Sequence, residues 1–191
     1  MSSLSTSLRL FLWLTFLTGI VYPLIITLIG YTFVNNKRTG DIIFVENRPI
    51  GAKLIGQKFE SDRYFHNRPS NINYNPLNSG EKVLGPTSLE LREKVEEREE
   101  IIAKKFEFKG HIPSELLFAS ASGLDPHISK EAALMQVDSV MAARGLNAEH
   151  RYVILKLIDE LNSQPFRSYG KPYINVLLLN HSLDLTFRSL M

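Results

Sequence analysis

LFLWLTFLTGIVYPLIITLIGYTFV, residues 10–34, decides the architecture of this chain. Apart from two tyrosines the stretch has no ionisable side chain, and as a helix it would cross the roughly 30 Å hydrocarbon core of a bilayer with some tilt. It is longer than the apolar region of a cleaved signal peptide, and no small-x-small cleavage site follows it. The predicted division is a tail, one transmembrane helix and a soluble domain: 1–9, 10–34 and 35–191.

Small or helix-bending residues recur every four positions within the predicted span: Thr15, Gly19, Pro23 and Thr27. Small residues at this spacing let membrane helices approach closely. The alternative is the ordinary composition of membrane helices, with Pro23 only bending this one. We expect this face to pack against another helix of a membrane assembly.

The charges that flank the span bear on its orientation. Arg9 precedes the span, whereas four basic residues follow it, and the positive-inside rule would therefore place the large domain in the cytoplasm. The four are Lys37, Arg38, Arg48 and Lys53.

Composition excludes several classes of function. The 22 basic and 20 acidic residues leave a net charge of +2, so the chain lacks the electrostatic footprint of a nucleic-acid-binding protein. The absence of cysteine excludes disulfides, thiolate metal sites and cysteine nucleophiles. The five histidines are dispersed without ligand spacing, so we expect no metal site.

The soluble domain mixes helical and strand patterns, which predicts an α+β fold. A loop rich in Asn and Pro occupies 64–88, and a capping box of Thr87 and Glu90 opens the helix that follows it. Gly145 suits the end of one helix, and Asn147 caps the next. The expected strands are 42–45, 53–56 and a buried 173–179; the expected helices run to about 105, over 130–144 and over 148–161.

SASGLDPHIS, residues 120–129, contains the residue types of several sites. Ser122, Asp125 and His127 match a serine triad, but all three lie within six positions and no G-x-S-x-G elbow is present. Free amides before a helix also suit a phosphate. We favour a turn followed by Ser129 as a helix N-cap, and leave phosphate contact open.

The motifs YFHNRPS, NYNPLNSGEKVLGPTS and ASASGLDPHIS, in this order behind GIVYPL and before NVLLLN, resemble those of the KdpC family, the C subunits of Kdp potassium-transporting ATPases. Ala121 departs from the glycine that is common in that family. The resemblance implies a non-enzymatic accessory subunit of the bacterial inner membrane, with the Kdp A, B and F subunits as partners. It also implies a cytoplasmic N-terminus and an extracytoplasmic domain, against the count of flanking charges.

Family members are described as catalytic chaperones that raise the affinity of the ATP-hydrolysing subunit for ATP. For this chain that role would assign nucleotide contact to Ser122, Gly123 and Gln136. A second expectation is that the loop carrying Phe65, His66, Arg68 and Pro69 docks on a partner, the alternative being a loop packed on its own domain. The competing function is a membrane-anchored extracytoplasmic hydrolase that uses Ser122 and His127.

Overall fold

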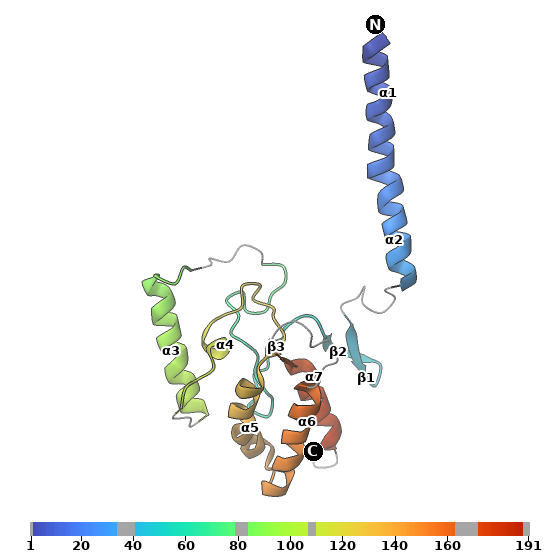
Figure 1. Cartoon of the computed structure of the whole chain (residues 1–191). Helices are drawn as coiled ribbons and strands as arrows, with labels where there is room; N and C mark the ends of the chain where they lie inside the picture. Colours follow the sequence, from blue (N-terminus) through green and yellow to red (C-terminus); the bar gives the residue numbers. More distant parts are fainter. Residues whose placement is uncertain (1, 34–40, 79–83, 107–109, 163–171, 189–191) are drawn as a thin grey trace. The chain divides into compact units, whose positions relative to one another are not determined.

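The computed structural model describes residues 2–33, 41–78, 84–106, 110–162 and 172–188. The chain forms two compact units, Met1–Asp41 and Ile42–Met191. Figure 1 traces both.

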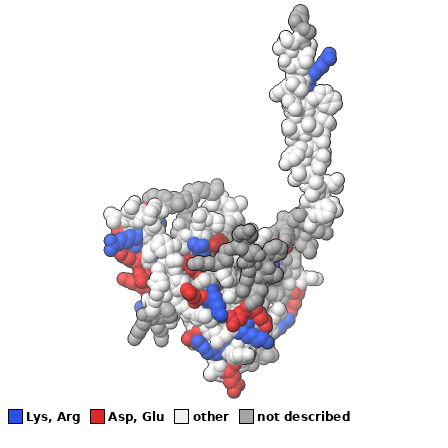
Figure 2. Space-filling model, viewed as in Figure 1, with Lys and Arg blue, Asp and Glu red and all other residues white. Residues whose placement is uncertain are grey.

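The described residues 2–33 of the first unit form a single run of helix. Within it, Ser3–Phe33 is 31 residues long and apolar enough to cross a membrane, and none of its most apolar part is buried by the chain. Arg9 is the one charged residue among 2–33, and Figure 2 shows this helix almost entirely white. The length and apolar composition of this helix confirm the prediction of one membrane anchor. Its three consecutive elements are α1 (Ser2–Phe16), the π-helical turn η1 (Leu17–Val21) and α2 (Tyr22–Phe33).

The π-helical turn has its cause in Pro23. Proline has no N–H, and its ring would clash with the carbonyl of the residue four positions earlier, here Gly19. The helix widens just before the proline, where the N–H of Tyr22 donates to the carbonyl of Leu17, five positions back. The proline thus changes the local winding without ending the helix.

The second unit begins with an antiparallel hairpin of β1 (Ile42–Val45) and β2 (Arg48–Ala52). Its two turn residues, Glu46 and Asn47, have φ of 50° and 63°, as a tight primed turn requires. The return strand therefore starts at once and ends before 53–56. The first predicted strand is confirmed and the one predicted at 53–56 is wrong, because the tight turn brings the return strand forward to Arg48–Ala52.

The core of the second unit lies among three helices, α5, α6 and α7, which carry most of its buried apolar side chains. Gly145, at φ 67°, ends α5 in the left-handed conformation, and the helix bounds predicted from the sequence agree to within a residue. The short strand β3 pairs antiparallel with β4 and joins the 120–129 stretch to the start of α7. The bounds are β3 (His127–Ile128), α5 (Lys130–Arg144), α6 (Ala148–Asn162), β4 (Ile174–Asn175) and α7 (Val176–Thr186).

The buried strand predicted at 173–179 is wrong for most of its length. Only Ile174–Asn175 is strand, and the Asn175 side chain then caps α7 by accepting the N–H of Leu178 at 3.1 Å. Periodicity does not distinguish a short apolar run in a strand from one in a buried helix. Asn175 as an N-cap was the distinguishing signal.

Two further helices precede 120–129: α3 (Leu89–Lys105) and the short α4 (Ser114–Leu117). The N-cap of α3 is Ser88, whose hydroxyl accepts the N–H of Leu91 at 3.4 Å, and not the predicted Thr87. The predicted helix entrance at Ser129 is confirmed, because its hydroxyl accepts the N–H of Ala132 at 3.1 Å. The fold is α+β, as predicted.

Candidate functional site

Two buried side-chain amides hold the backbone of consecutive residues in YFHNRPS. Asn180 of α7 accepts the N–H of Phe65 at 2.8 Å and donates to its carbonyl at 2.9 Å. Gln136 of α5 accepts the N–H of His66 at 2.7 Å and donates to its carbonyl at 3.2 Å. Each amide thus pairs with the backbone N–H and carbonyl of one residue in an irregular segment, as a neighbouring strand does in a sheet.

Gln136, one of the three residues expected to contact nucleotide, lies in the core. Its side chain is 0% exposed, and its amide nitrogen also donates to the carbonyl of Ala132 at 3.1 Å. Both polar atoms of the amide are therefore hydrogen-bonded within the domain. A nucleotide would reach Gln136 only if this packing opened.

The other two residues expected to contact nucleotide lie in the turn before β3. Ser122 is exposed, and its hydroxyl accepts the N–H of Leu124 at 3.1 Å. Gly123 is buried at φ 67°, and a Cβ there would lie 2.5 Å from Cγ1 of Ile72 and 3.3 Å from the hydroxyl of Ser70. The turn therefore packs closely against the Asn/Pro-rich loop, and only Ser122 of the three faces solvent.

Asp125 joins this turn to the YFHNRPS segment. Its carboxylate accepts from Arg68 Nη1 at 3.1 Å, and from the ring Nδ1 and the backbone N–H of His127, each at 3.1 Å. The hydrogen bond from His127, helped by the nearby charge of Arg68, holds the pKa of Asp125 below its ordinary value despite partial burial. Asp125 is thus an ionised junction between two loops.

These contacts do not assemble a serine hydrolase in the described part of the chain. Asp125 orients His127 as a triad carboxylate would, but no hydrogen bond links the imidazole to Ser122. The ring of His127 packs edge-on against Tyr173 at 4.4 Å between centroids. The serine hydroxyl is instead an acceptor within its own turn.

The loop expected to dock on a partner is packed largely on its own domain. Phe65 is 0% exposed in the core, while the side chains of His66 and Arg68 keep 22% and 26% of their surface. For Phe65 the self-packed alternative therefore holds. His66, Arg68 and the half-buried Pro69 retain some surface.

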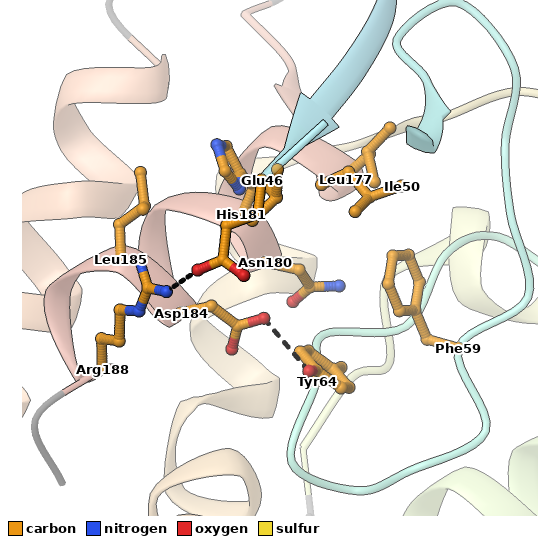
Figure 3. Close-up of a pocket in the computed structure, with 11 residues that line it drawn as sticks. Glu46, Ile50, Phe59, Tyr64, Leu177, Asn180, His181, Asp184, Leu185 and Arg188 are labelled. Carbon is orange, nitrogen blue, oxygen red and sulfur yellow. Dashed lines mark hydrogen bonds and ion pairs between the residues drawn. The ribbon is translucent and has the colours of Figure 1, made fainter. Parts of the chain in front are cut away.

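A groove of about 430 Å³ lies between the β1–β2 hairpin, the loop before Tyr64 and α7 (Figure 3). Its walls are mainly apolar, and four of its polar side chains bind one another in two pairs. The hydroxyl of Tyr64 donates to Asp184 at 3.1 Å, and Arg188 pairs with Glu46 across the opening. The lining residues include Val45, Ile50, Phe59, Leu177, His181 and Leu185.

Arg144, the last residue of α5, contacts two residues that line this groove, Asp184 and Tyr64. Only 2% of its side chain is exposed, and it donates to Asp184 at 2.7 Å and to the carbonyl of Arg63 at 2.6 Å. Its guanidinium also lies 5.0 Å from the centre of the Tyr64 ring. One buried cation thus fixes three elements of the domain.

Sequence reasoning missed Asn180, Arg144 and Asp184. A signal for the first was available, since Asn180 directly follows the apolar run VLLL, and a polar residue beside a buried run needs a partner. In the sequence, Arg144 is only a basic residue in the last turn of a helix, and such residues are common on protein surfaces. Among the described residues, no group of three His, Asp or Glu side chains is placed to hold a metal ion.

The model of the KdpC family, described as "K+-transporting ATPase, c chain", matches residues 4–185. The chain belongs to the KdpC family. The resemblance inferred from the sequence motifs is confirmed.

Curated relatives cover almost the whole chain. A potassium-transporting ATPase KdpC subunit from Leptospira interrogans is 40% identical over 185 residues, which are 96% of this chain and 94% of the relative. The one from Methylibium petroleiphilum is 43% identical, with 95% and 96% covered. The one from Pectobacterium atrosepticum is 38% identical, with 96% and 97% covered.

Proposed function

We propose that the chain is a non-catalytic accessory subunit of the Kdp potassium-transporting ATPase, held in the inner membrane by Ser3–Phe33 and stabilising the assembly of the A, B and F subunits. Membership of the KdpC family and the printed names of its relatives support the assignment to this complex. Ser122 and His127 form hydrogen bonds with other groups and not with each other, which supports the non-catalytic role.

The observation that carries the proposal is a long apolar helix that the rest of the chain leaves uncovered. On this helix Gly19 and Gly30 have open space where a Cβ would lie, and Thr18 turns its hydroxyl back to the carbonyl of Leu14 at 2.8 Å. Such a surface offers backbone for close approach and no exposed hydroxyl donor at Thr18. It suits packing against other membrane helices.

The packing role is tested by adding bulk on the face of small residues. The double variant Gly19→Leu with Thr27→Leu should lower the recovery of the intact complex on detergent gels, because added side chains separate the helices. The pair Leu14→Phe with Leu28→Phe adds bulk off that face and should leave recovery unchanged. Equal recovery of the complex for both pairs would contradict the packing role.

We also propose that the soluble domain lies outside the cytoplasm, as in the family, against the count of flanking charges. The chain has no cysteine, so one introduced thiol reports its own side of the membrane. Asn78→Cys, at an exposed position, should react with an impermeant thiol reagent on intact cells. Ser3→Cys should react only after permeabilisation, and the reverse pattern would overturn this orientation.

A role in raising ATP affinity stays a prediction. Of the three residues assigned to it, only Ser122 is exposed, so nucleotide photolabelling of the full chain and of Ser122→Ala is the direct test. A Gln136 variant is less informative, because it removes core hydrogen bonds together with any nucleotide contact. Unchanged labelling in Ser122→Ala would remove Ser122 from the predicted site. The same variant addresses the hydrolase alternative, which requires a complete loss of function.

A further inference from the structure

Three ionisable side chains meet where the last turn of α3 reaches the YFHNRPS segment. Lys105, the last residue of α3, places its Nζ 2.6 Å from Oδ1 of Asp62 and 3.0 Å from Nε2 of His66. The imidazole Nε2 and the Asp62 carboxylate are 3.8 Å apart. The backbone of Phe59 also faces the ring and favours its charged form.

The donors and acceptors of this cluster fix the charge on the imidazole. An ammonium group has three N–H donors and no lone pair, so Lys105 can only donate to His66. Nε2 must then present its lone pair, which makes the ring neutral with its proton on Nδ1. A proton added at Nε2 would set two N–H donors and two positive charges against each other at a separation of 3.0 Å.

The two sides of the cluster are not held equally. The backbone of His66 is fixed by its two hydrogen bonds with Gln136, so that side stays in place. On α3, Arg98 donates to the carbonyl of Leu117 and to Asn71, each at 2.9 Å, near the middle of the helix. Loss of the Lys105 contact would therefore loosen the C-terminal end of α3 while its middle stays attached.

We propose that Lys105, His66 and Asp62 form a proton-sensitive latch, closed when His66 is neutral and open when His66 takes up a proton. The latch holds the end of α3 on the segment that Gln136 and Asn180 anchor to the core. An extracytoplasmic domain meets the pH of the surroundings, so on the proposed topology the latch would let the domain respond to external acidity.

The charges around the ring set the direction of the response. Burial and the positive charge of Lys105 lower the pKa of His66, and together they exceed the opposing effects of the Phe59 backbone and of Asp62. A histidine with a lowered folded-state pKa contributes stability above its unfolded value, near 6.5, and loses it as pH falls through the folded-state pKa. The latch should therefore open on the acid side of neutrality.

Hydrogen exchange on the full chain in detergent micelles tests the latch. Between about pH 7.5 and about pH 5.5, which spans the usual range of histidine, the protection of amides 103–106 should fall several-fold after correction for intrinsic exchange. The amide of Phe106, which donates to Ile102 at 3.0 Å, is the direct reporter. Buried amides of α5 should keep their protection.

Variants separate the latch from general acid sensitivity. His66→Gln cannot gain a charge and should remove the pH response, whereas Lys105→Met should show low protection at both pH values. Lys104→Met and His150→Gln should behave as wild type.

Two results would overturn the latch: constant wild-type protection at residues 103–106, or a full response in His66→Gln. Should a variant misfold, ¹⁵N spectra of the wild-type histidine rings still decide, because Nε2 of His66 must be the unprotonated nitrogen at about pH 7.5.

Discussion

Asn180 and Phe65 share two hydrogen bonds of opposite direction, one from the N–H of Phe65 to the side chain of Asn180 and one back to the carbonyl of Phe65. They lie 115 positions apart in the chain, and both are buried. The pair explains how an irregular segment passes through the core, since each of its buried backbone groups needs a partner.

Replacing Asn180 by alanine should destabilise the domain strongly. The change leaves a buried N–H and a buried carbonyl without partners, at about 1–3 kcal/mol each. Denaturant unfolding of the full chain, followed by circular dichroism, should show a free energy of unfolding lower by roughly 2–6 kcal/mol. Asn78→Ala, in the exposed part of the loop, should change it by less than about 0.5 kcal/mol. A small effect at Asn180 would mean that water replaces the amide.

Gly123 and Gly145 form a matched pair for separating strain from steric clash. Both have φ of 67°, but a Cβ at Gly145 meets nothing within 4 Å, whereas one at Gly123 would lie 2.5 Å from Ile72. Gly145→Ala should therefore lower the free energy of unfolding by about 1 kcal/mol, the ordinary penalty for alanine in this conformation. Gly123→Ala should lower the free energy of unfolding by about 1–3 kcal/mol more than Gly145→Ala does, which is typical of overpacking. Equal losses in thermal unfolding would show that Ile72 moves freely.

Arg144 should matter far more to stability than a surface arginine with a similar ion pair. Arg144→Met removes the buried cation that pairs with Asp184, whose side chain is 35% exposed, and should lower the free energy of unfolding by about 1–3 kcal/mol. Arg151→Met breaks an exposed pair with Asp138 and should lose less than about 1 kcal/mol. Adding Asp184→Asn to Arg144→Met should recover part of the loss. A double-mutant cycle without coupling would contradict this pairing.

The sequence predicted the local features of the fold well and the long-range ones poorly. The apolar span, Gly145 as a helix end and Ser129 as an N-cap are each set by neighbours within a few positions, and the structure confirms them. The strand predicted at 173–179 failed because one cap residue, Asn175, outweighed a run of branched residues. Burial does not distinguish a strand from a helix here, because either element would bury the same apolar side chains.

The site was predicted only in outline for a different reason. YFHNRPS and SGLDPHIS identified the family, and Asp125 does join them through Arg68. The assignment of Gln136 to nucleotide contact, however, rests on the role implied by the family resemblance, whereas its 0% exposure depends on a partner 70 residues away. The spacing of residues in the sequence does not reveal contacts between positions so far apart. A polar residue in a helix therefore gives the same sequence pattern whether it binds a ligand or a loop of its own domain.

Stability in acid should depend on Asp125. Its folded-state pKa is lowered, chiefly by the hydrogen bond from His127, so its contribution is complete above the ordinary aspartate value of about 3.9 and is lost as pH falls through the folded-state pKa. Asp125→Asn should lower the free energy of unfolding at neutral pH by roughly 1–2 kcal/mol, and this difference should shrink in acid. Urea unfolding from neutral pH to about pH 3 measures it. Ser122→Ala retains the carboxylate and should retain the wild-type acid loss, whereas an Asp125→Asn difference constant across this range would show that the carboxylate is not the group that titrates.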